Sequence, residues 1–182
     1  MENYEKQIRS IAERLTGMVF DLLEISEEKR KWIGASDVSA ALQLNFYPKC
    51  PEPSRAMGLA PHTDTSVFTI LQAKSSGLQI FKEGKGWIPV HPLPNALIVH
   101  TGDFLHIMSN ARFTTPLHRV MPNEDKERYS MAFFYSPPTD YVLSPSVAMD
   151  PDSAVRFRDV TVKEYIGIKV EKFSDSLAFI ST

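Results

Sequence analysis

The stretch SVFTILQAKSSGLQIFKEGKGWIPVHPLPNALIVHTG (residues 66–102) alternates short β-branched and aromatic runs with clusters of Gly, Pro and polar residues. Runs of about four to eight such residues, bounded by turn signals, are typical of β-strands. The same pattern begins earlier, at ALQLNFY (41–47), and continues later through FTTPLHRV (113–120) and YSMAFFY (129–135). Many short strands with turns between them indicate a sandwich or barrel, so we predict a mainly β fold.

Helices are expected at both ends of this β region. Apolar residues recur at three- and four-residue spacing from about Asn3 to Glu24, which is the period of an amphipathic helix. Near the other end, Thr161-Val162-Lys163-Glu164 matches the S/T-x-x-E capping box, in which each side chain accepts a hydrogen bond from the other residue's backbone N–H. Within the β region, the Gly-containing loop 83–86 between two strand-like runs predicts an antiparallel hairpin.

Composition limits the function classes. At 182 residues and 20.6 kDa the chain is long enough for one domain with its own core. Its 20 Lys and Arg against 22 Asp and Glu give a net charge of −2, which offers no basic surface for nucleic acid. Cys50 is the only cysteine, which suits a reducing compartment, and no segment has the pattern of an export signal or a membrane span. We therefore expect a cytoplasmic monomer without a nucleic-acid or membrane partner.

Two histidines and an aspartate form the pattern H-x-D…H, in which His62 and Asp64 are two positions apart and His118 follows 54 positions after Asp64. Residues two apart on an extended strand project to the same side, and an antiparallel jelly roll lays late strands against early ones. Two imidazoles and one carboxylate are the ligand set of non-haem Fe(II) oxygenases. The pair alone is weak, because His62 can equally cap a strand end and Asp64 can equally stabilise a turn.

Arg128 and Ser130 have the same two-residue spacing on a strand-like run, so both side chains can face one interior. A guanidinium inside a protein requires an anion, and its fork matches a carboxylate in a bidentate geometry, with the Ser130 hydroxyl as a further donor. This pairing suits the far carboxylate of a dicarboxylic keto acid. The alternative is a surface ion pair between Arg128 and Glu124 or Glu127.

The remaining histidines, His91, His100 and His106, have no partner at convincing ligand spacing. We expect structural or solvent-facing roles for them, because an imidazole often simply occupies a polar edge. The aromatic run 133–135 is expected in the core rather than in a substrate platform.

Together these residues resemble the plant-type Fe(II)/2-oxoglutarate-dependent dioxygenases, over nearly the whole chain from about Ala41 to Ile168. Four motifs carry the likeness in the family's order: NFYPKCP (45–51), GLAPHTD (58–64), LHRV (117–120) and RYS (128–130). The resemblance implies a double-stranded β-helix, or jelly roll, with flanking N-terminal and C-terminal helices. It also implies three parts: a helical segment 1–37 that is the remnant of a longer N-terminal region, the dioxygenase domain 38–160, and a C-terminal helix and tail 161–182.

The resemblance further implies cofactors and roles. Fe(II) would be bound in the catalytic centre by the H-x-D…H residues His62, Asp64 and His118. The co-substrate 2-oxoglutarate would be held by Arg128, Ser130, Tyr47 and Asn45, with O2 as the oxidant and ascorbate as a candidate reductant. Within the family, RAMGLAPHTD (55–64), SGLQIF (76–81), GDFLHIMSNARF (102–113) and EYIGIK (164–169) look most like gibberellin 3-beta-dioxygenases.

Three functional hypotheses follow. The first is a dioxygenase that hydroxylates a small hydrophobic plant metabolite, with a gibberellin (3-beta-hydroxylation) as the expected substrate and a flavonoid or alkaloid as the alternative. The second is a truncated, non-catalytic barrel that binds metal or ligand. It arises because family members carry a sizeable N-terminal region, whereas only a helix and a short connection precede the barrel here, as in a fragment, a short splice product or an incomplete gene model. The third, a cupin-like metal hydrolase or isomerase, gives Arg128 and Ser130 no role.

Overall fold

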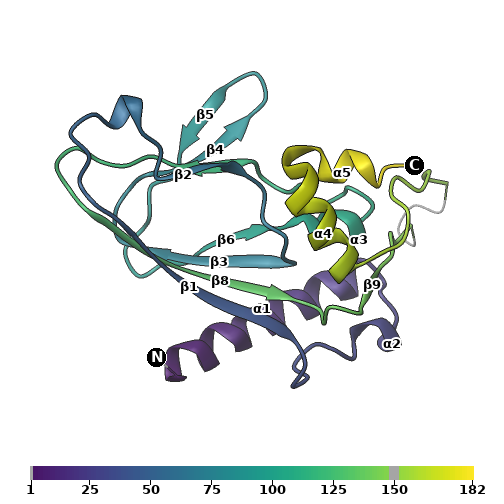
Figure 1. The fold of residues 1–182 in the computed structure, drawn as a ribbon. Coiled ribbons are helices and arrows are strands. Elements are labelled where there is room, and N and C mark those ends of the chain that lie inside the picture. Colours follow the sequence, from purple (N-terminus) through teal and green to yellow (C-terminus); the bar gives the residue numbers. More distant parts are fainter. Residues whose placement is uncertain (1, 148–151) are drawn as a thin grey trace.

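The computed structural model describes residues 2–147 and 152–182, and two four-stranded antiparallel sheets form its centre (Figure 1). The first sheet has the strand order β1 (Ser39–Tyr47), β8 (Arg128–Ser136), β3 (Phe68–Ala73) and β6 (Ile98–Thr101). The second has the order β2 (Leu59–His62), β7 (His118–Val120), β4 (Leu78–Lys82) and β5 (Gly86–Pro89). Both orders place late strands beside early ones, so residues far apart in the sequence become neighbours.

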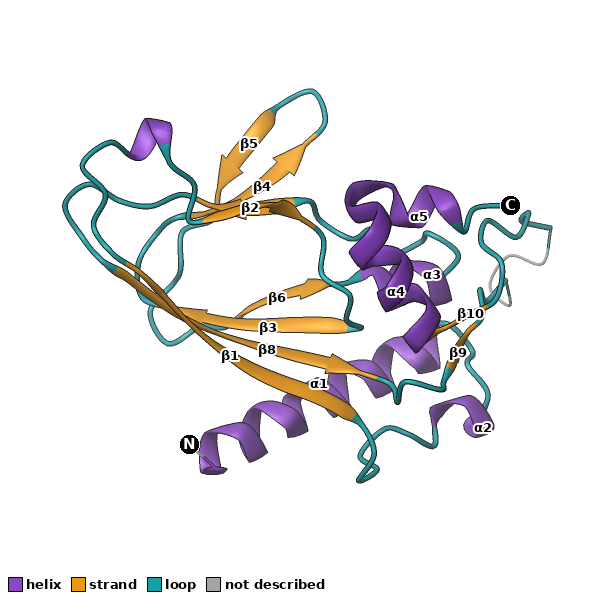
Figure 2. Ribbon diagram, viewed as in Figure 1, coloured by secondary structure: helices purple, strands orange, loops and turns teal. Residues whose placement is uncertain are grey.

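Helix α1 (Glu2–Leu22) lies along the outer face of the first sheet, where it packs against β3 and β8 (Figure 2). Its buried residues recur every four positions, at Ile8, Ala12, Thr16 and Phe20, as one face of a helix requires. The amphipathic helix predicted from about residue 3 to 24 is therefore confirmed. Between α1 and β1, the helix α2 (Glu27–Arg30) is a single turn without a buried residue.

The remaining elements gather mainly near the C-terminal end of the chain (Figure 1). They are the short helix α3 (Asp103–Met108) after β6, the two-stranded pair β9 (Val142–Leu143) and β10 (Val160–Thr161), and the terminal helices α4 (Val162–Lys172), η2 (Phe173–Asp175) and α5 (Ser176–Phe179). The exception is the single-turn helix η1 (Pro53–Arg55), which follows β1. None of the described helices is both long enough and apolar enough to span a bilayer.

Two local predictions can be compared directly with this architecture. Strands β4 and β5 pair antiparallel with Phe81 opposite Trp87, which confirms the hairpin. Thr161 is the N-cap of α4 and its hydroxyl accepts from the Glu164 N–H at 3.1 Å. The other expected hydrogen bond of the capping box, from the Thr161 N–H to the Glu164 carboxylate, is replaced: this carboxylate accepts from Arg158 at 2.8 Å instead.

Strand alternation gives the first sheet two distinct faces. On β8, Phe133 and Tyr135 are completely buried on the side of α1, as expected for core residues. Ala132 and Phe134 point the other way and line a cavity between the sheets. The aromatic run 133–135 is therefore divided between the core and the cavity. The division of the chain at residues 37 and 160 stays a prediction.

Candidate metal and co-substrate site

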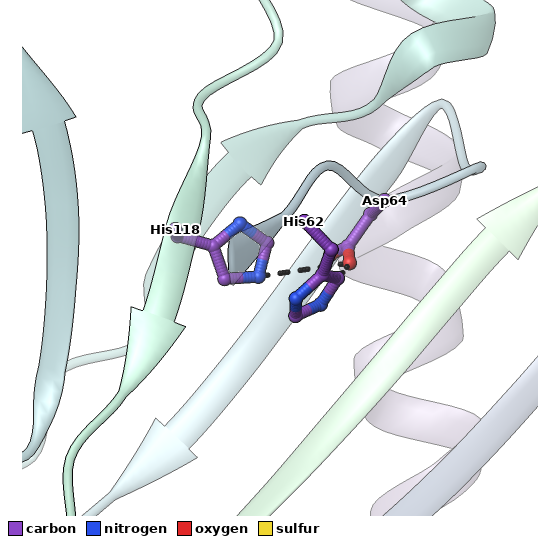
Figure 3. Close-up of side chains that lie close together, drawn as sticks. All are labelled: His62, Asp64 and His118. Carbon is purple, nitrogen blue, oxygen red and sulfur yellow. Dashed lines mark ion pairs between the residues drawn. The ribbon is translucent and has the colours of Figure 1, made fainter. Parts of the chain in front are cut away.

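His62, Asp64 and His118 converge at the end of β2 (Figure 3). Strands β2 and β7 pair antiparallel with His62 directly opposite His118, and Asp64 lies just beyond the end of β2. The Oδ1 atom of Asp64 is 3.3 Å from Nε2 of His62 and 3.6 Å from Nε2 of His118. Each residue offers one ligand atom, and the three atoms lie within 4.8 Å of one another. The pairing of β2 with β7 thus closes the 54-residue gap between Asp64 and His118.

Backbone carbonyls fix the orientation of both rings. Nδ1 of His62 lies 2.8 Å from the Ala60 carbonyl oxygen, and Nδ1 of His118 lies 3.1 Å from that of Pro116. A carbonyl can only accept, so each Nδ1 carries the proton and donates it, and each Nε2 keeps its lone pair. This is how protein ligands are oriented toward a metal by their outer neighbours.

The electrostatics of the cluster also favour a cation. Burial by itself would raise the pKa of Asp64, but the His62 contact, the charges of His100 and His118 and the Thr69 hydroxyl outweigh it and lower the pKa to about 2. Burial lowers the pKa of His118, which favours the neutral ring that binds metals. For His62 the burial effect is outweighed by Asp64 and the Ala60 carbonyl, so its pKa is raised. A carboxylate and two imidazole lone pairs facing one point fit a divalent cation.

One residue of this site was missed by the sequence analysis. His100 lines the cavity, and its Nε2 lies 3.6 Å from Oδ2 of Asp64. Burial is the main reason that its pKa is lowered to about 4. His100 therefore faces the cavity rather than solvent, and the structural role expected for it stays a prediction. Its position on the strand-like run ALIVHTG was a weak signal, because alternation alone does not show which strand lies opposite.

The four residues expected to hold the co-substrate lie together on the cavity face of the first sheet. In the β1–β8 ladder Tyr47 is directly opposite Arg128, and Asn45 is directly opposite Ser130. All four line the same cavity as the metal cluster. Arg128 is only 2% exposed and donates to the Ser130 hydroxyl at 2.9 Å. The alternative of a surface ion pair with Glu124 or Glu127 is therefore wrong.

Arg128 is held in place, but no acidic side chain among the described residues forms an ion pair with its guanidinium. Its guanidinium lies over the ring of Tyr47, 5.1 Å from the centroid, and its Nε has no hydrogen-bond partner within the described residues. Burial lowers the pKa of this guanidinium. Gly77 packs against the Arg128 stem in a left-handed conformation (φ +136°), and an added Cβ would lie 2.9 Å from Cδ of Arg128. The buried cation and its free N–H indicate a binding position for an anion.

The cavity has a volume of about 440 Å³, within the range of small-molecule sites. Helix α4 lines its metal end, and Lys169 of α4 donates to the Thr63 hydroxyl at 2.6 Å and to the Asp103 carboxylate at 2.7 Å. Thr63 is the residue between two of the triad side chains, so α4 is tied directly to the metal loop. Much of the remaining wall is apolar, formed by Leu59, Leu71, Leu78, Val120, Phe134, Val170 and Phe173.

Comparison with known proteins agrees with this geometry. A family model described as the 2OG-Fe(II) oxygenase superfamily matches residues 38–137. The chain belongs to this superfamily. Its H-x-D…H triad is intact, and Fe(II) and 2-oxoglutarate are the cofactors typical of this family.

Two curated relatives of this oxygenase are both named gibberellin 3-beta-dioxygenase 1. The protein from Pisum sativum is 42% identical over 183 residues, covering 97% of this chain and 49% of the relative. The protein from Arabidopsis thaliana is 41% identical over 186 residues, covering 99% of this chain and 52% of the relative. The chain therefore spans about half the length of the curated relatives that it matches.

Solved structures confirm the fold. The crystal structure of JOX2 in complex with 2OG, Fe, and JA superposes with a TM-score of 0.80 at 34% identity, covering 90% of this chain and 49% of that one. A dioxygenase for auxin oxidation from rice gives a TM-score of 0.84 at 24% identity, covering 99% and 62%. The predicted double-stranded β-helix with helices at both ends is thus confirmed.

Proposed function

We propose that this chain is an Fe(II)- and 2-oxoglutarate-dependent dioxygenase that hydroxylates a small hydrophobic plant metabolite, with gibberellins as the substrate class and 3-beta-hydroxylation as the reaction. The observation that carries the proposal is the convergence of two imidazoles and a carboxylate on one side of a cavity. The same cavity contains the buried guanidinium of Arg128, which has no acidic partner among the described residues. The gibberellin assignment is supported by relatives that are about 40% identical to the chain.

In this proposal the residues divide the work. Nε2 of His62, Nε2 of His118 and Oδ1 of Asp64 bind the iron, and the two carbonyl-bound Nδ1 atoms keep the rings oriented. Arg128 and Ser130 bind the distal carboxylate of 2-oxoglutarate, while Tyr47 and Asn45 pack beside it. When bound, the iron supplies the oxidative chemistry that couples 2-oxoglutarate decarboxylation to hydroxylation of a carbon atom.

The walls of the cavity support an apolar substrate. Leu59 lies near the metal loop, and Val170 and Phe173 belong to the terminal helices that line the same end. These side chains can bury a hydrophobic ring system and exclude water from the metal. A cupin-like hydrolase would leave Arg128 and Ser130 without a role.

The test combines metal binding with turnover. Wild-type protein should bind Fe(II) anaerobically and, on admission of air, release labelled CO2 from 2-oxoglutarate, with more release in the presence of the correct compound from a panel of gibberellin precursors, flavonoids and alkaloids. Asp64→Ala should lose tight Fe(II) binding and CO2 release, because it removes the only anionic ligand. Wild-type iron content and succinate formation in Asp64→Ala would contradict the ligand assignment. Iron binding without any CO2 release by the wild type would support the non-catalytic barrel.

A further inference from the structure

The two oxygens of the Asp64 carboxylate have different neighbours. Oδ1 faces the Nε2 atoms of His62 and His118, at 3.3 Å and 3.6 Å. Oδ2 accepts from the Thr69 hydroxyl at 2.5 Å and lies 3.6 Å from Nε2 of His100. One oxygen is therefore available to a metal, and the other is already surrounded by polar hydrogen-bonding groups of the protein.

Thr69 and His100 reach Oδ2 as a cross-strand pair. They are directly opposite each other in the β3–β6 ladder, so their side chains leave the first sheet on the same face and at the same level. Thr69 is 2% exposed, and its hydroxyl also contacts the Ser66 hydroxyl at 3.0 Å. Ser66 can donate to Thr69, which leaves the Thr69 proton for Asp64.

The described polar groups near the His100 ring include the Asp64 carboxylate, the Thr101 backbone and the His118 ring, whose centroid is 4.8 Å away. The His100 side chain is 10% exposed, and its Nδ1 is buried without a hydrogen-bond partner among the described residues. Nε2 is the ring atom that faces Oδ2 of Asp64. At 3.6 Å the contact is electrostatic rather than a full hydrogen bond.

We infer that Thr69 and His100 are positioning residues on the first sheet that hold Oδ2 of Asp64, so that the carboxylate would bind the metal through Oδ1 alone. The inference rests on the metal centre proposed above. Carboxylates bind metals through one oxygen or through both. A carboxylate bound through both would occupy a position that 2-oxoglutarate or dioxygen needs. The pair would thus keep the open face of the iron available to both reagents.

Four variants test this role. Thr69→Val and His100→Phe remove the polar contacts with little change of shape, whereas His100→Gln keeps an amide N–H donor near the position of Nε2. Val99→Ala is the matched control, because Val99 is the neighbouring residue on β6, is 43% exposed and points to the opposite face. Each purified protein is titrated anaerobically with Fe(II), and the charge-transfer absorption of the Fe(II)–2-oxoglutarate chelate is recorded at saturating iron. Thermal unfolding monitors the fold.

We expect the Fe(II) dissociation constant to rise about 10- to 100-fold in Thr69→Val and in His100→Phe, the range found for lost outer-sphere partners. The chelate absorption should weaken in both, because 2-oxoglutarate then competes with Oδ2. His100→Gln should restore both readouts to within about threefold of wild type, and Val99→Ala should leave them unchanged.

Several outcomes would overturn the inference. Wild-type iron affinity and chelate absorption in a folded Thr69→Val or His100→Phe protein would do so, and so would equal losses in His100→Gln and His100→Phe, which would indicate a packing role. Should His100→Phe fail to fold, Thr69→Val and His100→Gln decide the question. A wild-type protein that binds no Fe(II) would instead refute the proposed function itself, which the same titration detects before any variant is compared.

Discussion

Replacing Lys169 with Met should destabilise the protein far more than the loss of an ordinary surface lysine. The Asp103 carboxylate is completely buried, and its Oδ2 accepts from Lys169 at 2.7 Å, from Tyr165 at 2.9 Å and from Thr63 at 3.2 Å. Its Oδ1 has no partner among the described residues. Among the described residues, Lys169 is therefore the only cation in contact with this buried carboxylate. Met has a similar length without the charge.

The expected cost can be worked from these contacts. Removing one partner of a buried ion pair typically destabilises a protein by about 3–5 kcal/mol, because the other charge stays buried and unpaired. Here Tyr165 and Thr63 continue to donate, so we expect a loss of about 3 kcal/mol, at the lower end of that range. Domains have a total stability of only about 5–15 kcal/mol. The loss should be obvious in a urea titration.

The assay is urea unfolding of metal-free protein, since bound metal would add its own stabilisation. Lys172→Met is the matched control: it lies on the same helix, its side chain is 38% exposed and its ion pair with Glu171 is on the surface. The control should cost under about 1 kcal/mol. In a Lys169→Met background, Asp103→Asn should recover part of the loss by removing the unpaired charge. The reasoning is refuted if Lys169→Met costs no more than Lys172→Met, or if Asp103→Asn makes the Lys169→Met protein still less stable.

Two further predictions concern Arg128 and Tyr135. Arg128→Lys keeps the charge but loses the bidentate fork, so the apparent KM for 2-oxoglutarate should rise about tenfold. A tenfold rise corresponds to about 1.4 kcal/mol of lost binding free energy. An unchanged KM would count against the proposed binding of the distal carboxylate by Arg128. Burial raises the pKa of Tyr135 from 10.0 to about 12, so its phenol stays protonated in the folded chain after it has ionised in the unfolded one. The free energy of unfolding that depends on this phenol is complete below pH 10 and is lost as the pH rises toward 12, by about 3 kcal/mol at most. In urea titrations at different pH values, Tyr135→Phe should lack this part of the pH dependence. Parallel curves of unfolding free energy against pH for the two proteins would disprove the assignment.

Local patterns allowed much of this structure to be predicted. The period of residues 3–24, the loop 83–86 and the sequence 161–164 each specify an element through contacts within a few residues, and the helix, the hairpin and the N-cap all occur. Alternation on β8 correctly placed Arg128 and Ser130 on one face. The boundaries at residues 37 and 160 stay predictions, because they concern the division of the chain into structural units rather than the position of a helix or strand.

What the sequence did not reveal depends on strand register between distant segments. His100 is a functional candidate only because β6 pairs with β3 and sets it opposite Thr69. The sequence indicates that both segments are strands, but not which strands are neighbours or how they are aligned, and a shift of one residue would turn His100 to the other face. His62 and His118 were found because their residue types match a known ligand set, which supplied the long-range pairing that propensity cannot supply.

The site depends on both sheets at once, and this has a consequence for its energetics. His62 and His118 belong to the second sheet. The cross-strand pair behind Asp64 and the proposed anion-binding pair, Arg128 and Ser130, belong to the first. The distance from this histidine pair to the Arg128 guanidinium is therefore set by the spacing of the sheets. An apolar cluster holds that spacing, with Leu71 and Ala132 from the first sheet packed against Leu78 and Val120 from the second. Because packed interiors transmit small changes of volume, we expect the proposed binding of 2-oxoglutarate across the cavity to depend on these apolar side chains as well as on the residues that would contact it.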